Sequence, residues 1–507
     1  MRTLIASWSS MKKTTGFLCA LAICLASAPS RADTTEDRFA AAGYFRVMAR
    51  PDLQGGDSRL GFWNLYGRLL NEGPWASLEL RLALLKQDPD SQEVWTRVHA
   101  KIEGGSVTNM DSGNGSLQNF RLTQLYAQAG NMLLKDVTWQ LGTLENYFGD
   151  LGLYDFRPST IFNDTVGLSA RYRKGPLEVL VGAGDAGFGL RADQYSTILT
   201  AGGAARMRLG SNVEVGVAGQ YYFEPKVEGN QFAPYNTPGV DYEDFVRGEV
   251  AERFLEENPG MEDFFPNPVA TSSQSHRLIG YLGFGGFGPV LWNNLFVNLT
   301  KAHPENFTTE QYMGREYTIY TNDFTDERFR LDIGTEMQLR VIPQRLDVVL
   351  AGWWGYHFDK DNDIVANDND RTFMSAIARA QLYVTETTHL LAETSIASET
   401  SNNGNLYRAH FDSVFENSGG TGDPRGLEFG DLATRKTWQG KVGWVLNPVG
   451  LGIYSRPSLR LLYGAQYSNQ NTAFGNNFIE TLDDFNVFPN QEVHWHHLLA
   501  LEAEAWF

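Results

Sequence analysis

The sequence has no long apolar run after its N-terminal region, and its mean hydropathy is negative, at −0.31. A membrane-spanning helix needs about 20 consecutive apolar residues, so a helical membrane protein is excluded. Cysteine is also scarce, because the 507 residues contain only Cys19 and Cys24. Both fall in the leader described below. The mature chain is therefore expected to contain no thiol and no disulfide, which suits passage through an oxidising compartment.

Positive charge is in short supply as well. Residues 1–32 hold four basic residues and no acid, which leaves 38 Lys and Arg against 60 Asp and Glu in residues 33–507, a net charge of −22. This excess argues against nucleic acid as a partner and against anion-selective transport. The sequence also lacks Gly-x-Ser-x-Gly, His-Glu-x-x-His and phosphate-loop motifs. We therefore expect neither an enzyme nor a bound cofactor.

The first 32 residues have the layout of a secretory signal. Met11-Lys12-Lys13 is positively charged, residues 16–28 form an apolar core too short to span a membrane, and Ser30-Arg31-Ala32 supplies small residues for cleavage. The signal can start at Met1 or at Met11. Residues 33–507 are expected to form a single domain.

The C-terminal stretch shows the pattern that runs through the rest of the chain. Leu499, Leu501 and Ala503 alternate with Ala500, Glu502 and Glu504, and the chain ends in an aromatic pair. A strand with one apolar and one polar face suits a wall between lipid and water. An aromatic C-terminal residue on such a strand is typical of bacterial outer-membrane barrels. In the same way, four leucines at 78, 80, 82 and 84 alternate with Ser77, Glu79 and Arg81.

Similar alternation predicts an all-β fold, a transmembrane antiparallel β-barrel with long extracellular loops. Bacterial single-chain barrels have even strand numbers, so we expect about 18 strands, with 16 as the alternative, and one spurious segment. The tight turns are expected at 71–74, 173–175 and 209–211. The strands are expected near 39–50, 63–69, 77–84, 93–104, 119–130, 134–144, 165–173, 176–185, 196–209, 212–224, 276–287, 291–301, 328–341, 345–357, 372–384, 386–399, 436–448, 454–469 and 491–507.

Aromatic residues stand beside charges on the polar faces of several expected strands. Tyr44 and Arg46 are two residues apart, Trp75 precedes Glu79 and Arg81 on one face, and Trp506 shares a face with Glu502 and Glu504. A sugar ring has a flat C–H face that stacks on an aromatic plane, while charged groups exchange hydrogen bonds with its hydroxyls. These residues therefore indicate a lumen that contacts carbohydrate. The alternative is that they belong to the aromatic girdles of any barrel.

Three other patterns have a functional and a plain interpretation. The acidic stretch 240–265 is expected to form a short helix at the channel mouth. Asp359–Asp363 resembles the start of a calcium loop, but Ile364 stands where the sharp turn needs Gly, which favours a solvated loop. His494, His496 and His497 could hold a metal, although polar interfacial side chains are the simpler interpretation.

Short segments at both ends of the mature chain resemble the maltoporins, the sugar porins of the bacterial outer membrane. The similar segments follow the family order, and residues 200–440 match only in strand rhythm. They are Gly43–Arg46, Arg68–Glu72 followed by Trp75, Phe120-Arg121, Gly149-Asp150, Tyr154–Phe156, Tyr454–Arg460, which is similar to the family's Trp-Ser-Arg-Pro-x-x-Arg, and Trp506-Phe507.

The resemblance implies an 18-stranded homotrimer in the outer membrane, with a loop folded inward to constrict the channel. It implies passive diffusion of maltodextrin-type oligosaccharides along an aromatic path flanked by polar residues. The aromatic path would contain Tyr44, Trp75 and Trp506, with Trp444 as a looser candidate. The polar tracks would contain Arg46, Arg68, Arg121, Asp150 and Asp155, beside Arg157.

The sequence departs from the family at the constriction. Leu144 and Phe148 occupy positions where the family has arginines, and Arg157 replaces the Tyr that follows Asp-Phe. These changes predict a wider or less basic channel and leave the sugar open. The alternatives are a substrate-tolerant, cation-preferring diffusion porin, and an outer-membrane enzyme or adhesin that uses the acidic loops.

Overall fold

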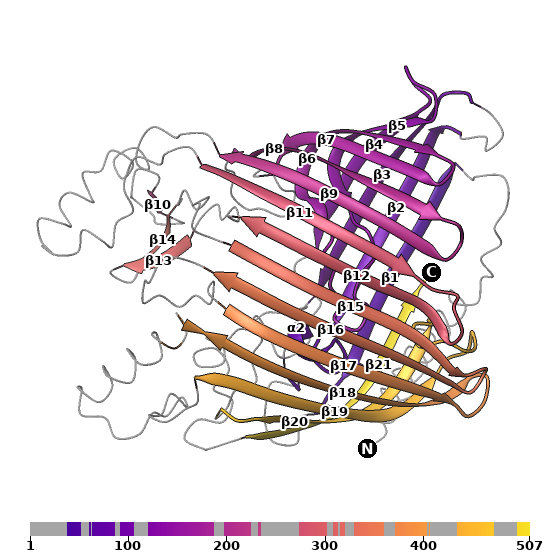
Figure 1. The fold of residues 1–507 in the computed structure, drawn as a ribbon, viewed down its shortest axis with the longest axis vertical. Coiled ribbons are helices and arrows are strands. Elements are labelled where there is room, and N and C mark those ends of the chain that lie inside the picture. Colours follow the sequence, from indigo (N-terminus) through magenta and orange to yellow (C-terminus); the bar gives the residue numbers. More distant parts are fainter. Residues whose placement is uncertain are drawn as a thin grey trace, which may run out of the picture.

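Eighteen strands form one antiparallel sheet that closes on itself in the computed structural model (Figure 1). Each barrel strand pairs with the next one along the chain, and β1 (Phe39–Ala49) pairs with β21 (Trp495–Trp506) to complete the ring. The structure describes residues 38–51, 60–61, 63–86, 92–105, 120–186, 197–224, 232–234, 273–301, 308–312, 315–319, 329–358, 371–402, 405, 433–470 and 494–507.

The other barrel strands are β2 (Trp75–Leu85), β3 (Trp95–Gly105), β4 (Arg121–Gly130), β5 (Val137–Asn146), β6 (Ile161–Lys174), β7 (Leu177–Asp185), β8 (Leu199–Leu209), β9 (Val213–Glu224), β11 (Ser273–Phe284), β12 (Val290–Lys301), β15 (Phe329–Ile342), β16 (Leu346–Phe358), β17 (Arg371–Tyr383), β18 (Thr388–Ser401), β19 (Thr434–Leu446) and β20 (Ser458–Ser468). A separate three-stranded sheet contains β10 (Phe232–Pro234), β13 (Thr308–Tyr312) and β14 (Arg315–Ile319). The expectation of about 18 strands is confirmed.

The alternation of side chains places an apolar surface on the outside of the barrel. Leu78, Leu82 and Leu84 are exposed on the outer face of β2, whereas Glu79 and Arg81 lie on the opposite face. Outward positions of later strands follow the same rule, with Val217 and Met374 as examples. A closed barrel satisfies every ladder hydrogen bond internally, so an apolar outer face can be in contact with lipid. The chain thus has the architecture of an integral membrane β-barrel.

One expected strand is wrong. Residues 63–69 do not join the barrel, because Trp63–Tyr66 form the short helix α2 and the chain then passes through the interior. Leu65, Tyr66, Leu69 and Leu70 are almost completely buried. The apolar pattern arises because the segment is surrounded by the barrel wall. Among the described residues, no helix is long and apolar enough to cross a membrane.

The turn expected at residues 71–74 is also misplaced. These residues end the inner segment (residues 60–74), which connects β1 and β2 at the end of the barrel opposite the tight turns at 175–176 and 210–212. Asn71 and Glu72 are buried, and the amide Nδ2 of Asn71 donates to Gln439 Oε1 of β19 at 3.0 Å. The segment is therefore an interior element and not a periplasmic turn.

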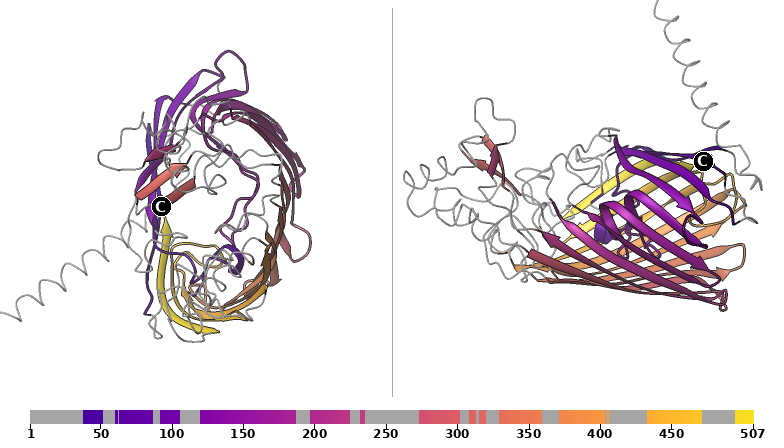
Figure 2. Two further views of the ribbon diagram at one scale, coloured as in Figure 1. Left: turned by 90° about the vertical axis from the view of Figure 1, so that its left-hand side faces the viewer. Right: turned by 90° about the horizontal axis from the view of Figure 1, so that it is seen from above.

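Two further connections enter the barrel interior. The inward loop (residues 147–160) runs between β5 and β6, and the exit segment (residues 447–457) runs between β19 and β20. Figure 2 shows α2 and the inward loop within the ring of strands. Buried side chains of the inward loop, including Phe148 and Tyr154, form one apolar cluster with Tyr281, Trp353 and Phe373 on the wall. The inward-folded loop that the resemblance implied is thus present.

Some expectations fall outside the described part of the chain. They are the signal at 1–32, the acidic helix at 240–265 and the calcium-like loop at 359–363.

Candidate functional site

The first and last strands bring two predicted aromatic contacts together. Tyr44 pairs in register with Trp506, and Arg46 pairs with Glu504 and with Trp75 of β2. Paired residues point to the same side of a sheet, so these side chains share the inward face. The hydroxyl of Tyr44 donates to Glu504 Oε1 at 2.9 Å. The inward placement predicted for Tyr44, Trp75 and Trp506 agrees with this register.

Arg46 and Arg68 lie in a buried ion network rather than on an open track. Arg46 pairs with Glu72 of the inner segment, and Arg68 pairs with Glu504 of β21. Both arginine side chains are largely covered, at 5% and 11% exposed. The backbone amide of Arg68 also donates to the carbonyl of Leu153 at 3.0 Å. These arginines hold the inner segment to the wall and to the inward loop, and contact with a solute remains a prediction.

Glu72 occupies the centre of this network. Its carboxylate lies 3.9 Å from Arg68 Nε, and the side chain is 1% exposed. Burial raises the pKa of Glu72 to about 8, although the guanidinium groups of Arg46 and Arg68 act to lower it. Removal from water penalises the charged form of a carboxyl group more than these partners stabilise it. Burial therefore shifts the titration of Glu72 well above the range of an exposed carboxyl group.

The inward loop presents polar side chains to the interior. Asp150 and Asp155 are exposed, and Asp155 Oδ1 lies 3.7 Å from Arg68 Nη1. Arg157 stacks over the ring of Tyr147 at 4.3 Å and lies 3.8 Å from Glu145. Tyr147 and Arg157 are 40% and 48% exposed. The loop thus offers a ring and charges of both signs to a solute.

The interior side of the loop is fixed to the far wall. The backbone amide of Leu153 donates to Glu336 Oε2 of β15 at 2.8 Å, and Tyr154 donates to Ser375 of β17 at 3.1 Å. Phe148 stacks on Tyr281 of β11 with ring centroids 5.5 Å apart. These contacts reach three strands, so the position of Asp150 and Arg157 is set by the barrel wall.

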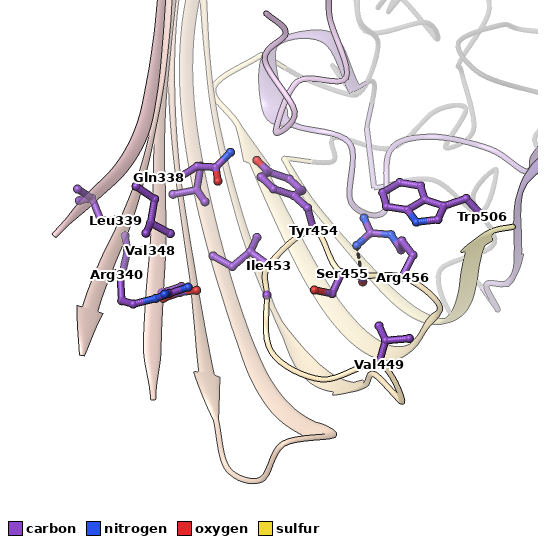
Figure 3. A pocket seen from close by; sticks show the side chains of 14 residues that line it. Gln338, Leu339, Arg340, Val348, Val449, Ile453, Tyr454, Ser455, Arg456 and Trp506 are labelled. Carbon is purple, nitrogen blue, oxygen red and sulfur yellow. Dashed lines mark hydrogen bonds and ion pairs between the residues drawn. The ribbon is translucent and has the colours of Figure 1, made fainter. Parts of the chain in front are cut away.

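Trp506 and the exit segment line a cavity of about 470 Å³ near the turn end of the barrel. Arg456 lies over the Trp506 ring at 5.6 Å, and Tyr454 extends into the same space (Figure 3). The hydroxyl of Tyr454 donates to Glu336 Oε1 at 2.7 Å. Sequence reasoning left Tyr454 and Arg456 out of the site. Tyr454 could have been identified from the sequence, because it stands where the similar maltoporin segment has its Trp.

Trp444 was wrongly included among the candidate contacts. Its neighbours at period two on β19, Val442 and Leu446, are exposed on the lipid side, whereas Lys441 and Gln439 are buried on the inner side. Trp444 is 52% exposed and pairs in register with Leu461, another outward residue. It is therefore a lipid-facing aromatic residue and cannot contact a solute in the lumen.

The remaining predicted residues lie at the edges of the site. Arg121 begins β4 and pairs in register with Glu103, which is buried on the inner face of β3. His496 points inward, where its Nδ1 lies 3.1 Å from the carbonyl oxygen of Leu60, and His497 shares the outer face with Tyr463. His494 Nδ1 lies 2.8 Å from the carbonyl oxygen of Ser468, so each of the three histidines has a different partner. Among the described residues, no group of three His, Cys, Asp or Glu side chains is arranged to hold a metal.

The wall formed by β6 to β9 is the part of the interior that sequence reasoning missed. Arg171 and Arg173 of β6 and Arg206 and Arg208 of β8 point inward, and Arg173 and Arg208 are more than 60% exposed. The pattern Arg-x-Arg occurs twice on polar faces and could have been found from sequence parity. The overall acidity of the chain obscured it.

Comparisons with known proteins give only distant structural likenesses. No protein-family model and no curated protein matches the chain. Among solved structures, the chain is similar to Pseudomonas aeruginosa OprD, with 8% identity, a TM-score of 0.41, and coverage of 95% of this chain and 98% of that one. Pseudomonas putida OprB has 10% identity, a TM-score of 0.41 and coverages of 92% and 94%. Pseudomonas aeruginosa OccK11 has 9% identity, a TM-score of 0.37 and coverages of 93% and 96%.

Proposed function

We propose that this chain is a passive outer-membrane channel for oligosaccharides of the maltodextrin type. In this proposal it works as a homotrimer, as the resemblance to maltoporins implies, and it carries no catalytic group and no cofactor. The solute diffuses along the inner face, and the inward loop narrows the path. Its partners are the sugar, the lipid and two further copies of the chain.

The observation that carries the proposal is the pairing of exposed rings with charges inside the barrel. The exposed ring of Trp506 stacks on the buried guanidinium of Arg456, and Tyr147 lies beside the exposed guanidinium of Arg157. A pyranose can place its C–H face on such a ring while its hydroxyls bond the adjacent guanidinium or carboxylate. Soluble ions need no ring, so this arrangement favours a carbohydrate. Binding must remain weak, since a channel that holds its solute tightly does not release it.

A second candidate is a substrate-tolerant diffusion channel. It is favoured by the shorter aromatic path that remains once Trp444 is assigned to the lipid side, and by the burial of Arg46 and Arg68. In that case exposed charges of both signs would pass many small polar solutes without a specific binding site. The cation preference expected from sequence is opposed by the exposed arginines of β6 and β8.

Planar-bilayer recording with the purified protein separates these candidates. A maltodextrin channel shows reversible, concentration-dependent block of ion current by millimolar maltotriose or maltohexaose, with longer block for the longer chain. A substrate-tolerant channel conducts ions without such block. Absence of any block over the soluble range of both sugars would overturn the proposal. Mass measurement of the detergent complex tests the trimer separately.

A further inference from the structure

Four arginines form a row on the inner wall close to the turns that follow β6 and β8. Arg171 and Arg173 lie on β6 and Arg206 and Arg208 on β8, whereas the outward residues Leu168, Met207 and Leu209 of the same strands are exposed. Glu178 of β7 lies between the two pairs of arginines, and Glu214 of β9 lies beside Arg208 on the other side of β8. We define these four arginines as the arginine row.

The two glutamates are shared by the whole row. Glu178 lies 2.8 Å from Arg173 Nε, 3.1 Å from Arg206 Nη2 and 3.4 Å from Arg171 Nη1. Glu214 lies 2.9 Å from Arg208 Nε and 3.5 Å from Arg206 Nη1. Four cations therefore face two anions, and the cluster keeps a net positive charge.

The number of hydrogen-bond donors also exceeds the number of acceptors. Each guanidinium carries about five N–H groups, and each carboxylate offers about four lone-pair positions. Two glutamates cannot accept from all the donors of four arginines. Arg173 and Arg208 are 62% and 65% exposed, so their remaining N–H groups face the lumen. Within the described residues, the cluster is open to an additional acceptor.

The opposite wall differs from the arginine row in the exposure of its cations. Its inward cations are covered: Arg379 and Lys441 enclose Glu393, and all three are nearly inaccessible beneath the inner segment. Lys441 Nζ also donates to the backbone carbonyl of Tyr66 at 3.0 Å. Glu393 thus pairs with both cations, and the inner segment covers them. The arginine row has no such cover in the described structure, and a solute can reach it.

We propose that the arginine row is a binding site for the carboxylate of an acidic saccharide in transit. The inference rests on the proposed sugar channel and narrows its substrate class to saccharides that carry a uronate or a similar carboxylate. A planar guanidinium binds a carboxylate through two parallel hydrogen bonds, and two exposed arginines on alternate strands can take the group in turn. The attraction between the arginine row and the carboxylate is electrostatic and acts over a short distance. The net negative charge of the whole chain therefore does not prevent it.

The test compares two sugars that differ only in charge. Maltotriose and maltotriose oxidised at carbon 6 to the uronate are titrated as current blockers on the full-length protein in planar bilayers. The wild-type channel is expected to be blocked by the uronate at a concentration roughly fivefold to tenfold lower than by the neutral sugar. This preference should shrink from about 0.1 M to about 1 M salt, because the screening length falls from about 10 Å to about 3 Å.

The variant is the double substitution Arg173→Gln with Arg208→Gln. It should remove most of the preference for the uronate and leave block by maltotriose unchanged. The glutamates keep partners in Arg171 and Arg206, so the wall keeps its ion pairs. Arg345→Gln is the matched control, because Arg345 is an exposed arginine in the turn between β15 and β16, outside the row.

The outcomes separate the two proposals. Equal block by both sugars in the wild type, or a uronate preference that survives the double substitution, overturns the arginine row as a binding site. Loss of the preference in Arg345→Gln to the same extent would also overturn it, since any rim arginine would then suffice. Block by the uronate without block by maltotriose would support the row and contradict the maltodextrin channel.

Discussion

Tyr44 and Trp506 face each other across the seam where the first and last strands close the barrel. Both point inward, and Glu504, which accepts from Tyr44, also pairs with Arg68, Arg456 and Arg460. The first and last strands meet at the point where the inner segment and the exit segment reach the wall. The candidate sugar contacts thus belong to the same cluster as the ion pairs that fix the inner segment and the exit segment to the wall.

Trp506→Ala should weaken sugar block and leave ion conductance largely unchanged. A ring that stacks on a sugar contributes about 0.5–1.5 kcal/mol, so the concentration of maltotriose for half block should rise roughly threefold to tenfold. Trp444→Ala is a close control, because Trp444 is equally exposed, at 52%, but on the lipid face. Equal weakening in both variants would show that the effect is general to the barrel and would remove Trp506 from the site.

Glu72 should make the inner segment sensitive to pH. Its pKa is raised from 4.5 to about 8 by burial, so the folded protein holds a proton that the unfolded chain has already released. Stability contributed by this group is therefore complete below about pH 4.5 and is lost as the pH rises toward 8. We expect the heat-denaturation temperature of the detergent-solubilised barrel to fall between pH 5 and pH 9. Glu72→Gln should flatten this dependence, and a slope that persists in the variant would assign it to other groups.

Glu336 should control the width of the channel. It accepts from the backbone amide of Leu153 and from the hydroxyl of Tyr454, so it joins the inward loop to the exit segment. Glu336→Ala leaves the buried amide of Leu153 without an acceptor, at a cost of about 1–3 kcal/mol, and also frees the half-buried hydroxyl of Tyr454, so both segments should loosen. Single-channel conductance and current noise should rise. Glu336→Gln keeps one acceptor oxygen and should have a smaller effect, and identical traces for all three proteins would contradict the tether.

Gly216 should be required for the inward loop to pack against the barrel wall. A Cβ at this position would lie 2.9 Å from Cε1 of the Phe148 ring, and Phe148 is buried against Tyr281. Gly216→Ala should push the ring away at a cost of about 1–3 kcal/mol, and it should alter the conductance. Gly280→Ala on the neighbouring strand places its Cβ where no atom lies within 4 Å, so it should behave as the wild type. A wild-type conductance for Gly216→Ala would show that the loop adapts.

Strand positions were predictable because a barrel strand has one lipid face and one aqueous face. The leucines at 78, 82 and 84, and the pairing of Tyr44 with Arg46 on one face, follow from a period of two and needed no coordinates. The same rule could have assigned Trp444 to the lipid side, since Lys441 and Gln439 occupy the other parity. The resemblance to a Trp-Ser-Arg-Pro segment suggested Trp444, but the aromatic residue of this region that lies inside the barrel is Tyr454.

The sequence by itself indicated an antiparallel barrel of about 18 strands and, for most strands, which face meets lipid, because the alternation of apolar and polar side chains depends on neighbours along one strand. Only the tertiary structure decided how the interior is filled. Leu65 and Tyr66 are buried because the barrel wall surrounds them. In the sequence, an apolar segment buried in this way looks the same as a barrel strand. Arg68 contacts Leu153 and Glu504, which are far from it in the sequence. Arg173 and Arg208 remain exposed because no inner segment covers them in the described structure. Such contacts depend on which wall the inner segments cover, and no local pattern encodes that choice.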